Sequence, residues 1–94
     1  MKILHLTLKK KWFDMIASGE KKEEYREIKP YWSSRLIEKH FTHICFRNGY
    51  AKDAPRLTIE LKGFCVCTGR TEWGAVEGEI YFVLELGEII PTEQ

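Results

Sequence analysis

The sequence lacks the long apolar runs that mark a membrane-spanning protein. None of its hydrophobic stretches approaches the roughly 20 residues that a helix needs to cross a bilayer. The N-terminal residues also lack the layout of a signal peptide, in which positive charge is followed by an apolar stretch. We therefore expect a cytoplasmic protein with no membrane partner.

The sequence also lacks a polar, low-complexity stretch and the length for two domains. Its 94 residues are 44% hydrophobic and 13% aromatic, which is typical of a folded globular chain. A chain of this length is too short for two ordinary domains. We expect residues 1–94 to form a single domain, and the composition leaves its oligomeric state open.

Cysteine and histidine are too few and too poorly spaced for a metal site. The three cysteines cannot all pair within the chain, and the spacing of Cys65 and Cys67 matches none of the usual zinc layouts. The three histidines have no carboxylate or cysteine at a metal-binding spacing. We predict that Cys45, Cys65 and Cys67 are buried free thiols, and we expect no metal and no cofactor.

Hydrophobic periodicity predicts an α+β fold. Leu4, Leu6 and Leu8 alternate with polar residues, which indicates a half-buried strand. Apolar residues at helical spacing follow and end at Gly19, where a left-handed helix cap is expected. The predicted strands are 3–8, 22–28, 42–47, 56–66 and 80–90, and the predicted helices are 9–18 and 30–39, with Trp32, Leu36 and Ile37 facing the core.

The fourth predicted strand changes its apolar face at Gly63. Leu57 and Leu61 share one parity, whereas Phe64 and Val66 take the other. A β-bulge at the glycine would restore a common face and bend the strand. We therefore expect a small, bent β-barrel of about five strands with two helices packed beside it.

The segment from Gly19 to Arg26 is nearly all charged, although it is predicted to be extended. Lys22, Glu24 and Arg26 share one parity, and burying them requires ion pairing or a solvent-filled cleft. Two interpretations stay open: a solvated edge strand whose charges prevent aggregation, or a strand that lines a binding cleft.

Three lysines, Lys9 to Lys11, stand at the start of the first predicted helix, where the helix dipole disfavours cations. They are either a solvated helix end or, if they face Lys21, Lys22 or Arg26, part of a positive field that attracts phosphate. The formal net charge of +1 does not distinguish the two.

The charged segment resembles the signature of the ASCH domains, Gly-x-Lys-x-x-Glu-x-Arg, which Gly19, Lys21, Glu24 and Arg26 fill. An aromatic-rich helix before the motif, Trp73-Gly74-Ala75 and the segment 86–90 are similar to the family as well. The resemblance implies a PUA-like β-barrel with a charged cleft between barrel and helices. It also implies RNA, a nucleotide or a modified nucleoside as the partner.

Some small ASCH proteins resemble N4-acetylcytidine amidohydrolases, and this resemblance implies a catalytic alternative. Lys21 matches their lysine, Glu24 stands where they have threonine, and their distant glutamate would be Glu72 or Glu77. A lysine in a partly dry cleft can act as a base or nucleophile, but neighbouring acids such as Glu24 favour the charged ammonium. We therefore rank binding above hydrolysis, with Lys21 and Glu24 as the catalytic candidates for an amidohydrolase or a ribonuclease.

Aromatic side chains beside basic residues could stack on bases, although each could equally belong to the core. The candidates are Tyr25, Tyr31, Trp32, Tyr50 and Trp73, of which Trp73 is preferred because a glycine follows it in a predicted loop. Arg47 precedes an Asn48-Gly49 turn and could contact a base edge or a phosphate. The predicted ligand-binding set is Lys9, Lys21, Lys22, Glu24, Tyr25, Arg26, Arg47 and Trp73.

Overall fold

The computed structural model describes residues 1–91, which form one five-stranded sheet with two helices. The strands are β1 (Ile3–Leu8), β2 (Glu23–Glu27), β3 (His43–Asn48), β4 (Arg56–Thr68) and β5 (Ile80–Ile89). The helices are α1 (Lys10–Ala17) and α2 (Pro30–Leu36), and a 3-10 turn, η1 (Thr71–Trp73), lies between β4 and β5. The predicted α+β fold with five strands and two helices is confirmed.

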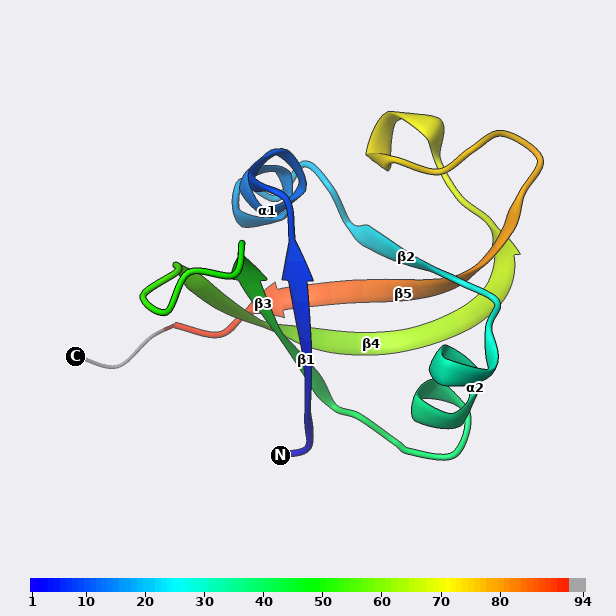
Figure 1. The fold of residues 1–94 in the computed structure, drawn as a ribbon, viewed down its shortest axis with the longest axis horizontal. Helices are drawn as coiled ribbons and strands as arrows, with labels where there is room; N and C mark the ends of the chain where they lie inside the picture. The colour runs from blue at the N-terminus through cyan, green and yellow to red at the C-terminus, as the bar shows by residue number, and fades with distance from the viewer. Residues whose placement is uncertain (92–94) are drawn as a thin grey trace.

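The strands lie in the order β1-β3-β4-β5-β2, with β1 and β3 parallel and the other pairs antiparallel. The long strands β4 and β5 curve, so that the sheet curls into a half-barrel with α1 and α2 at opposite ends of the view (Figure 1). The charged strand β2 pairs only with β5 and forms one edge of the sheet.

The bend in β4 comes from irregular pairing with β5. The register shifts between Ile59 and Leu61 and again between Leu61 and Gly63, as the change of apolar parity predicted. The predicted common face is restored, because Leu61, Phe64 and Val66 are opposite alternate residues of β5. Phe64 and Val66 nevertheless remain exposed on this face. Beyond the bulge β4 pairs with β5 alone, so nothing from β3 covers it.

The core lies inside the curl of the sheet. Alternate residues of β1 and β3 face it, and the middle of β5 is buried on both sides, as its uniformly apolar sequence predicted. The buried apolar cluster consists of Leu4, Leu6, Leu8, Phe13, Ile16, Leu36, Ile44, Phe46, Ile59, Phe82, Leu84 and Leu86.

Helix α2 ends at Leu36, earlier than the prediction of residue 39. Leu36 is buried, but Ile37 is exposed, so its predicted core position is wrong. Adjacent helical residues point about 100° apart, and only one of the two can face the sheet before the chain turns toward β3. No helix among the described residues is long and apolar enough to cross a membrane.

The cysteines differ from the prediction in part. Cys45 is buried and free, as predicted, whereas Cys65 and Cys67 form a disulfide near the exposed end of β4. Residues two apart on a strand project from the same face, and their Cα atoms are 6.0 Å apart, within reach of a disulfide. The prediction of buried free thiols is therefore wrong for these two residues.

Candidate functional site

Lys21 is a buried cation at the entrance to β2. Helix α1 ends at Ala17, and Gly19, two residues later, turns the chain with a positive φ of 86°. The Lys21 amide then donates to the carbonyl of Met15. This turn directs the side chain inward, where only 2% of the residue remains exposed. Its Nζ donates to Glu24 Oε1 at 2.8 Å and to the Glu23 carbonyl at 2.7 Å. The ammonium is thus held by a carboxylate and a backbone dipole.

Glu24 links Lys21 to Arg26. Its second oxygen, Oε2, lies 2.8 Å from Arg26 Nη2, and alternate residues of β2 share the face on which this contact forms. The alignment is that of an ion pair and not of a good hydrogen bond, because Arg26 Nε and Nη2 are buried without a hydrogen-bond partner in the described residues. We call these three residues the Lys21–Glu24–Arg26 triad. It carries one net positive charge.

Two aromatic rings cover the Lys21 ammonium. Nζ lies 5.4 Å from the ring centroid of Trp12 on α1 and 5.0 Å from that of Tyr25 on β2. A cation over an aromatic face is attracted to it, and the attraction grows when water is excluded. The Arg26 guanidinium likewise lies 5.3 Å from the ring centroid of Trp32. These rings pack against both cations of the triad.

A cleft of 460 Å³ opens against the triad. Glu24 and Arg26 form its charged wall, Lys9 and Trp12 come from the start of α1, and Tyr50 comes from the loop after β3. Its lining residues are Thr7, Leu8, Lys9, Trp12, Glu24, Arg26, Gly49 and Tyr50. The cleft therefore combines a carboxylate acceptor, guanidinium and ammonium donors, and two aromatic side chains.

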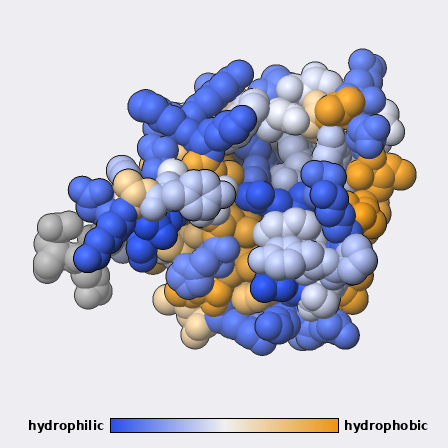
Figure 2. All heavy atoms as spheres, viewed as in Figure 1, coloured by the Kyte–Doolittle hydropathy of each residue, from blue (hydrophilic) through white to orange (hydrophobic). Residues whose placement is uncertain are grey.

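Exposed hydrophilic side chains gather over α1, at one side of the sheet (Figure 2). Lys9, Lys10 and Lys11 are all exposed, and Lys10 pairs with Asp14 at 2.5 Å. Of these lysines only Lys9 lines the cleft. Of the three lysines at the start of α1, only Lys9 therefore places its positive charge at the cleft, where Arg26 also lies.

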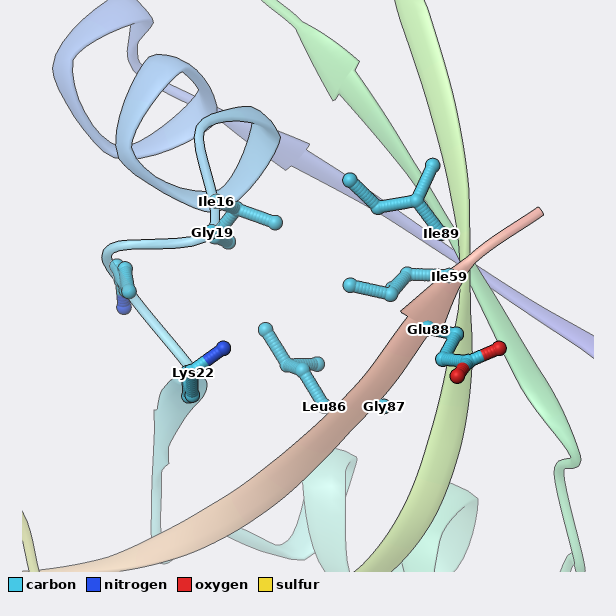
Figure 3. Close-up of a pocket in the computed structure, with 9 residues that line it drawn as sticks. Ile16, Gly19, Lys22, Ile59, Leu86, Gly87, Glu88 and Ile89 are labelled. Atoms are coloured by element: carbon cyan, nitrogen blue, oxygen red, sulfur yellow. The ribbon is translucent and has the colours of Figure 1, made fainter. Parts of the chain in front are cut away.

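A second cavity, of 360 Å³, lies between the end of α1, the first part of β4 and the end of β5. The side chains of Ile16, Ile59, Leu86 and Ile89 project into it, and its wall includes Gly19 and Lys22 (Figure 3). Lys21 also lines it, but the hydrogen-bond partners of its ammonium are on β2. Three of its lining residues, Lys21, Lys22 and Glu88, are charged, as three are in the cleft beside the triad. The cleft has in addition the hydroxyls of Thr7 and Tyr50, so it offers more groups that could orient a polar ligand.

Tyr25 is on the opposite face of β2 from Glu24 and does not line the cleft. Its hydroxyl donates to Glu23 Oε1 at 2.8 Å and accepts from the Arg70 amide at 2.9 Å. Burial raises the pKa of Tyr25 well above its usual range, and the hydrogen bond and charge of Glu23 add to the rise. Tyr25 therefore fixes the loop that follows β4 and covers Lys21, two structural roles.

The other predicted binding residues lie outside the cleft. Trp73 is half-buried in η1 with the Arg70 guanidinium 4.9 Å from its ring centroid, and Lys22 is exposed beside the second cavity. Arg47 lines a separate hollow on the outer face of the sheet. The cleft thus brings together Lys9, Glu24 and Arg26, with Lys21 bonded behind them.

Trp12 and Tyr50 were not in the predicted binding set. The helical spacing of Trp12 predicts only that it belongs to the first helix, and the sequence marks Tyr50 only as a stacking candidate. The structure places both at the cleft, and Tyr50 is 87% exposed. The signal that marks Tyr50 is its position directly after the Asn48-Gly49 turn, which presents it to solvent.

The candidate distant glutamates lie on the surface. Glu72 pairs with Arg70 at 3.6 Å, and Glu77 is also exposed. The Lys21 ammonium bonds to Glu23 and Glu24 instead. Within residues 1–91 no group of three His, Cys, Asp or Glu side chains could hold a metal ion.

Comparison with known proteins adds no assignment. No protein-family model matches the chain, and no curated protein sequence matches it either. The site therefore has to be interpreted from its own geometry.

Proposed function

We propose that this protein binds a nucleobase of RNA, of a nucleotide or of a modified nucleoside in the cleft beside the Lys21–Glu24–Arg26 triad, in an intracellular setting. The observation that carries the proposal is that a buried carboxylate and a partly buried guanidinium lie side by side on one cleft wall. Base edges offer adjacent donors and acceptors, which such a pair can read. The resemblance to ASCH domains supports the same class of ligand.

The triad suits binding because its charges are held before any ligand arrives. Lys21 and Arg26 fix both oxygens of Glu24, so that the carboxylate does not have to be ordered when a base binds. Arg26 Nε keeps a donor that no described residue uses. Trp12 and Tyr50 supply flat apolar surface beside these groups, as sites for single-stranded nucleic acid do.

A second candidate function is hydrolysis of a modified nucleoside, with Lys21 central, and the observation that favours it is the burial of this lysine directly behind the cleft. The geometry gives more support to binding, because the two partners of Nζ, a carboxylate and a carbonyl, both accept hydrogen bonds from an ammonium. A neutral amine could still donate to both acceptors, but it would leave the buried Glu24 carboxylate without the positive charge of Lys21. A ribonuclease would additionally require a general acid and base on opposite sides of a phosphodiester.

One experiment tests both candidates. The isotopically labelled protein is titrated with N4-acetylcytidine and with cytidine while protein amide shifts and the ligand acetyl signal are followed by NMR. Binding predicts saturable shifts at the amides of Thr7, Glu24 and Tyr50 without release of acetate. Acetate release that is lost in Lys21→Arg would establish the hydrolase instead.

A matched pair of variants locates the binding site. Arg26→Gln removes a charge from the cleft wall and should weaken nucleoside binding about tenfold, which corresponds to one charge-assisted hydrogen bond. Lys29→Gln removes an equal charge from an exposed side chain outside the cleft and should leave binding unchanged. Equal affinities in the two variants would contradict the proposed site.

A further inference from the structure

We propose that the outer face of β1, β3 and β4 carries a binding site for a phosphate group, formed by Arg47 and Arg56 with His5 and Thr7 beside them. The phosphate would be that of the nucleotide or RNA whose base occupies the cleft, so this part of the inference rests on the proposed function. The site itself is argued from four observations that do not depend on the cleft.

The first observation is the pairing of two like charges. Arg47 on β3 and Arg56 on β4 are directly opposite each other in the antiparallel ladder. Like charges at such positions are destabilising unless something neutralises them. None of the ion pairs formed within residues 1–91 involves either arginine. An anionic ligand would supply the missing countercharge.

The second observation is a hollow at the same place. A cavity of 250 Å³ is lined by His5, Leu6, Thr7, Cys45, Arg47 and Arg56. The strand register pairs Thr7 with Arg47, and Arg47 with Arg56, so that their side chains form a row across three strands on one face. A hydroxyl and two guanidinium groups around one hollow are the donors that phosphate prefers.

The third observation is that Arg47 is held in place with a donor unused. Its Nη2 donates to the carbonyl of Ala51 at 2.5 Å and more weakly to that of Tyr50 at 3.4 Å. Its Nε is buried and has no partner in the described residues. A guanidinium fixed on one side by the backbone loses little conformational freedom when it binds an anion on the other.

The fourth observation is that the arginines and the nearest acidic strand residue lie at opposite ends of this face. Among the strand residues that project from this face, the acid nearest to the two arginines is Glu60, which pairs with His43 at the other end of the strands. At about 3.3 Å per residue, the four residues from Arg56 to Glu60 separate the two side chains by roughly 13 Å. No acidic strand residue therefore lies at the arginine end of this face, and Asp53, in the loop between β3 and β4, forms no ion pair with either arginine within the described residues.

Thr7 connects this hollow to the cleft beside the triad, because it lines both. Tyr50 also belongs to both regions, since its side chain lines the cleft and its carbonyl accepts from Arg47. A nucleotide with its base in the cleft could therefore extend its phosphate past Thr7 toward Arg47 and Arg56. This route predicts that a phosphate adds affinity to a nucleoside.

The first test uses inorganic phosphate alone, titrated into the labelled protein at constant ionic strength with chloride as the reference anion. We expect amide shifts at Thr7, Arg47 and Arg56, and an affinity at least about tenfold lower in Arg56→Gln, because a charge-assisted contact is lost. Arg56 is exposed, so the variant should fold. Lys39→Gln, an equal charge change outside the hollow and the cleft, should bind phosphate as the wild type does.

Two outcomes of this test overturn the inference. One is the absence of saturable shifts with phosphate beyond those seen with chloride. The other is an equal affinity in Arg56→Gln and Lys39→Gln, which would show that the response comes from general surface charge.

The second test identifies the source of the phosphate by comparing cytidine, cytidine 5′-monophosphate and the dinucleotide CpC. Tighter binding of the monophosphate than of cytidine, lost in Arg56→Gln, indicates a terminal phosphate. An equal gain in affinity for CpC over cytidine indicates that the site binds a phosphate of the RNA backbone. If cytidine binds and neither phosphate raises the affinity, the phosphate site is overturned and the proposed function stands. If inorganic phosphate binds but cytidine does not, the phosphate site stands and the proposed function is overturned.

Discussion

The Lys21 ammonium is removed from water, and two oxygen acceptors and two aromatic rings take the place of its hydration shell. Burial of a charge is costly unless its partners are complete. Because Glu24 depends on the same contact, the two residues stabilise each other. The triad is thus a coupled unit whose members cannot be removed independently.

Lys21→Met should lower the free energy of unfolding by about 3 kcal/mol, because it leaves Glu24 buried with one of its two cations gone. Lys22→Met is the matched control, since Lys22 is adjacent and exposed, and it should cost less than about 0.5 kcal/mol. The double variant Lys21→Met/Glu24→Gln should cost less than the sum of its single changes. Additive losses measured by urea unfolding would contradict the coupling.

The raised pKa of Tyr25 predicts a dependence of stability on pH. The folded state holds the phenol proton more tightly than the unfolded chain, whose tyrosines titrate near about pH 10. The stabilisation is therefore fully present below that pH and is lost as the pH rises above it. Wild type should lose more stability than Tyr25→Phe between roughly pH 8 and pH 10.5 in urea unfolding. Equal losses in the two proteins would show that Tyr25 is not responsible.

At the scale of elements, the segment from β4 to β5 is attached to the charged strand and to α1. The Arg70 amide donates to Tyr25 and the Val76 amide donates to Tyr81. Gly74, with a φ of 103°, brings the loop against Trp12, so that an added Cβ would lie 3.0 Å from the indole ring. This contact joins the loop to a wall of the cleft.

Gly74→Ala should therefore destabilise the protein more than Gly78→Ala. Both glycines have positive φ, which costs an L-residue about 1 kcal/mol, but an added Cβ at Gly78 meets nothing within 4 Å. The contact with Trp12 should raise the cost at Gly74 to roughly 2 kcal/mol or more. Gly74→Ala should also weaken cytidine binding, because Trp12 lines the cleft. Equal unfolding free energies of the two variants would contradict this reasoning.

Local patterns predicted most elements, because alternation and turn residues act over a few positions. The Leu4 to Leu8 alternation predicted β1, and the parity change at Gly63 predicted the bulge in β4. The cleft was predictable only in part, because Lys9, Glu24 and Tyr50 are brought together by three separate elements. The Cys65–Cys67 disulfide was missed because no zinc or loop pattern distinguishes two cysteines on one strand face from free thiols.

At the scale of the whole molecule, two of the four strand pairs join strands that are far apart in the sequence. β1 pairs with β3 about 40 residues later, and β2 pairs with β5, so that Glu24 is opposite Leu84. Closing long loops costs entropy before the contacts form. The sheet should therefore form slowly compared with a helical protein of the same length.

Refolding in stopped-flow experiments should take milliseconds to seconds, on the order of other domains dominated by non-local strand pairs. The tryptophan fluorescence of Trp12 provides the signal, because its ring packs against Lys21 and Gly74 only in the folded state. The double variant Trp32→Phe/Trp73→Phe leaves Trp12 as the one tryptophan, so that the signal comes from this residue. Complete refolding within microseconds would contradict the dominance of non-local pairing.

Because β2 pairs with β5 alone, it cannot join the sheet during translation until β5 has been synthesised. A ribosome releases Lys21, Glu24 and Arg26 early, but their strand has no neighbour in the sheet until residues 80–89 have left the exit tunnel. A nascent chain halted before that point would carry every residue of the cleft without the support that orders β2. Ligand binding by ribosome-bound chains of increasing length would therefore report the moment at which the last strand enters the sheet.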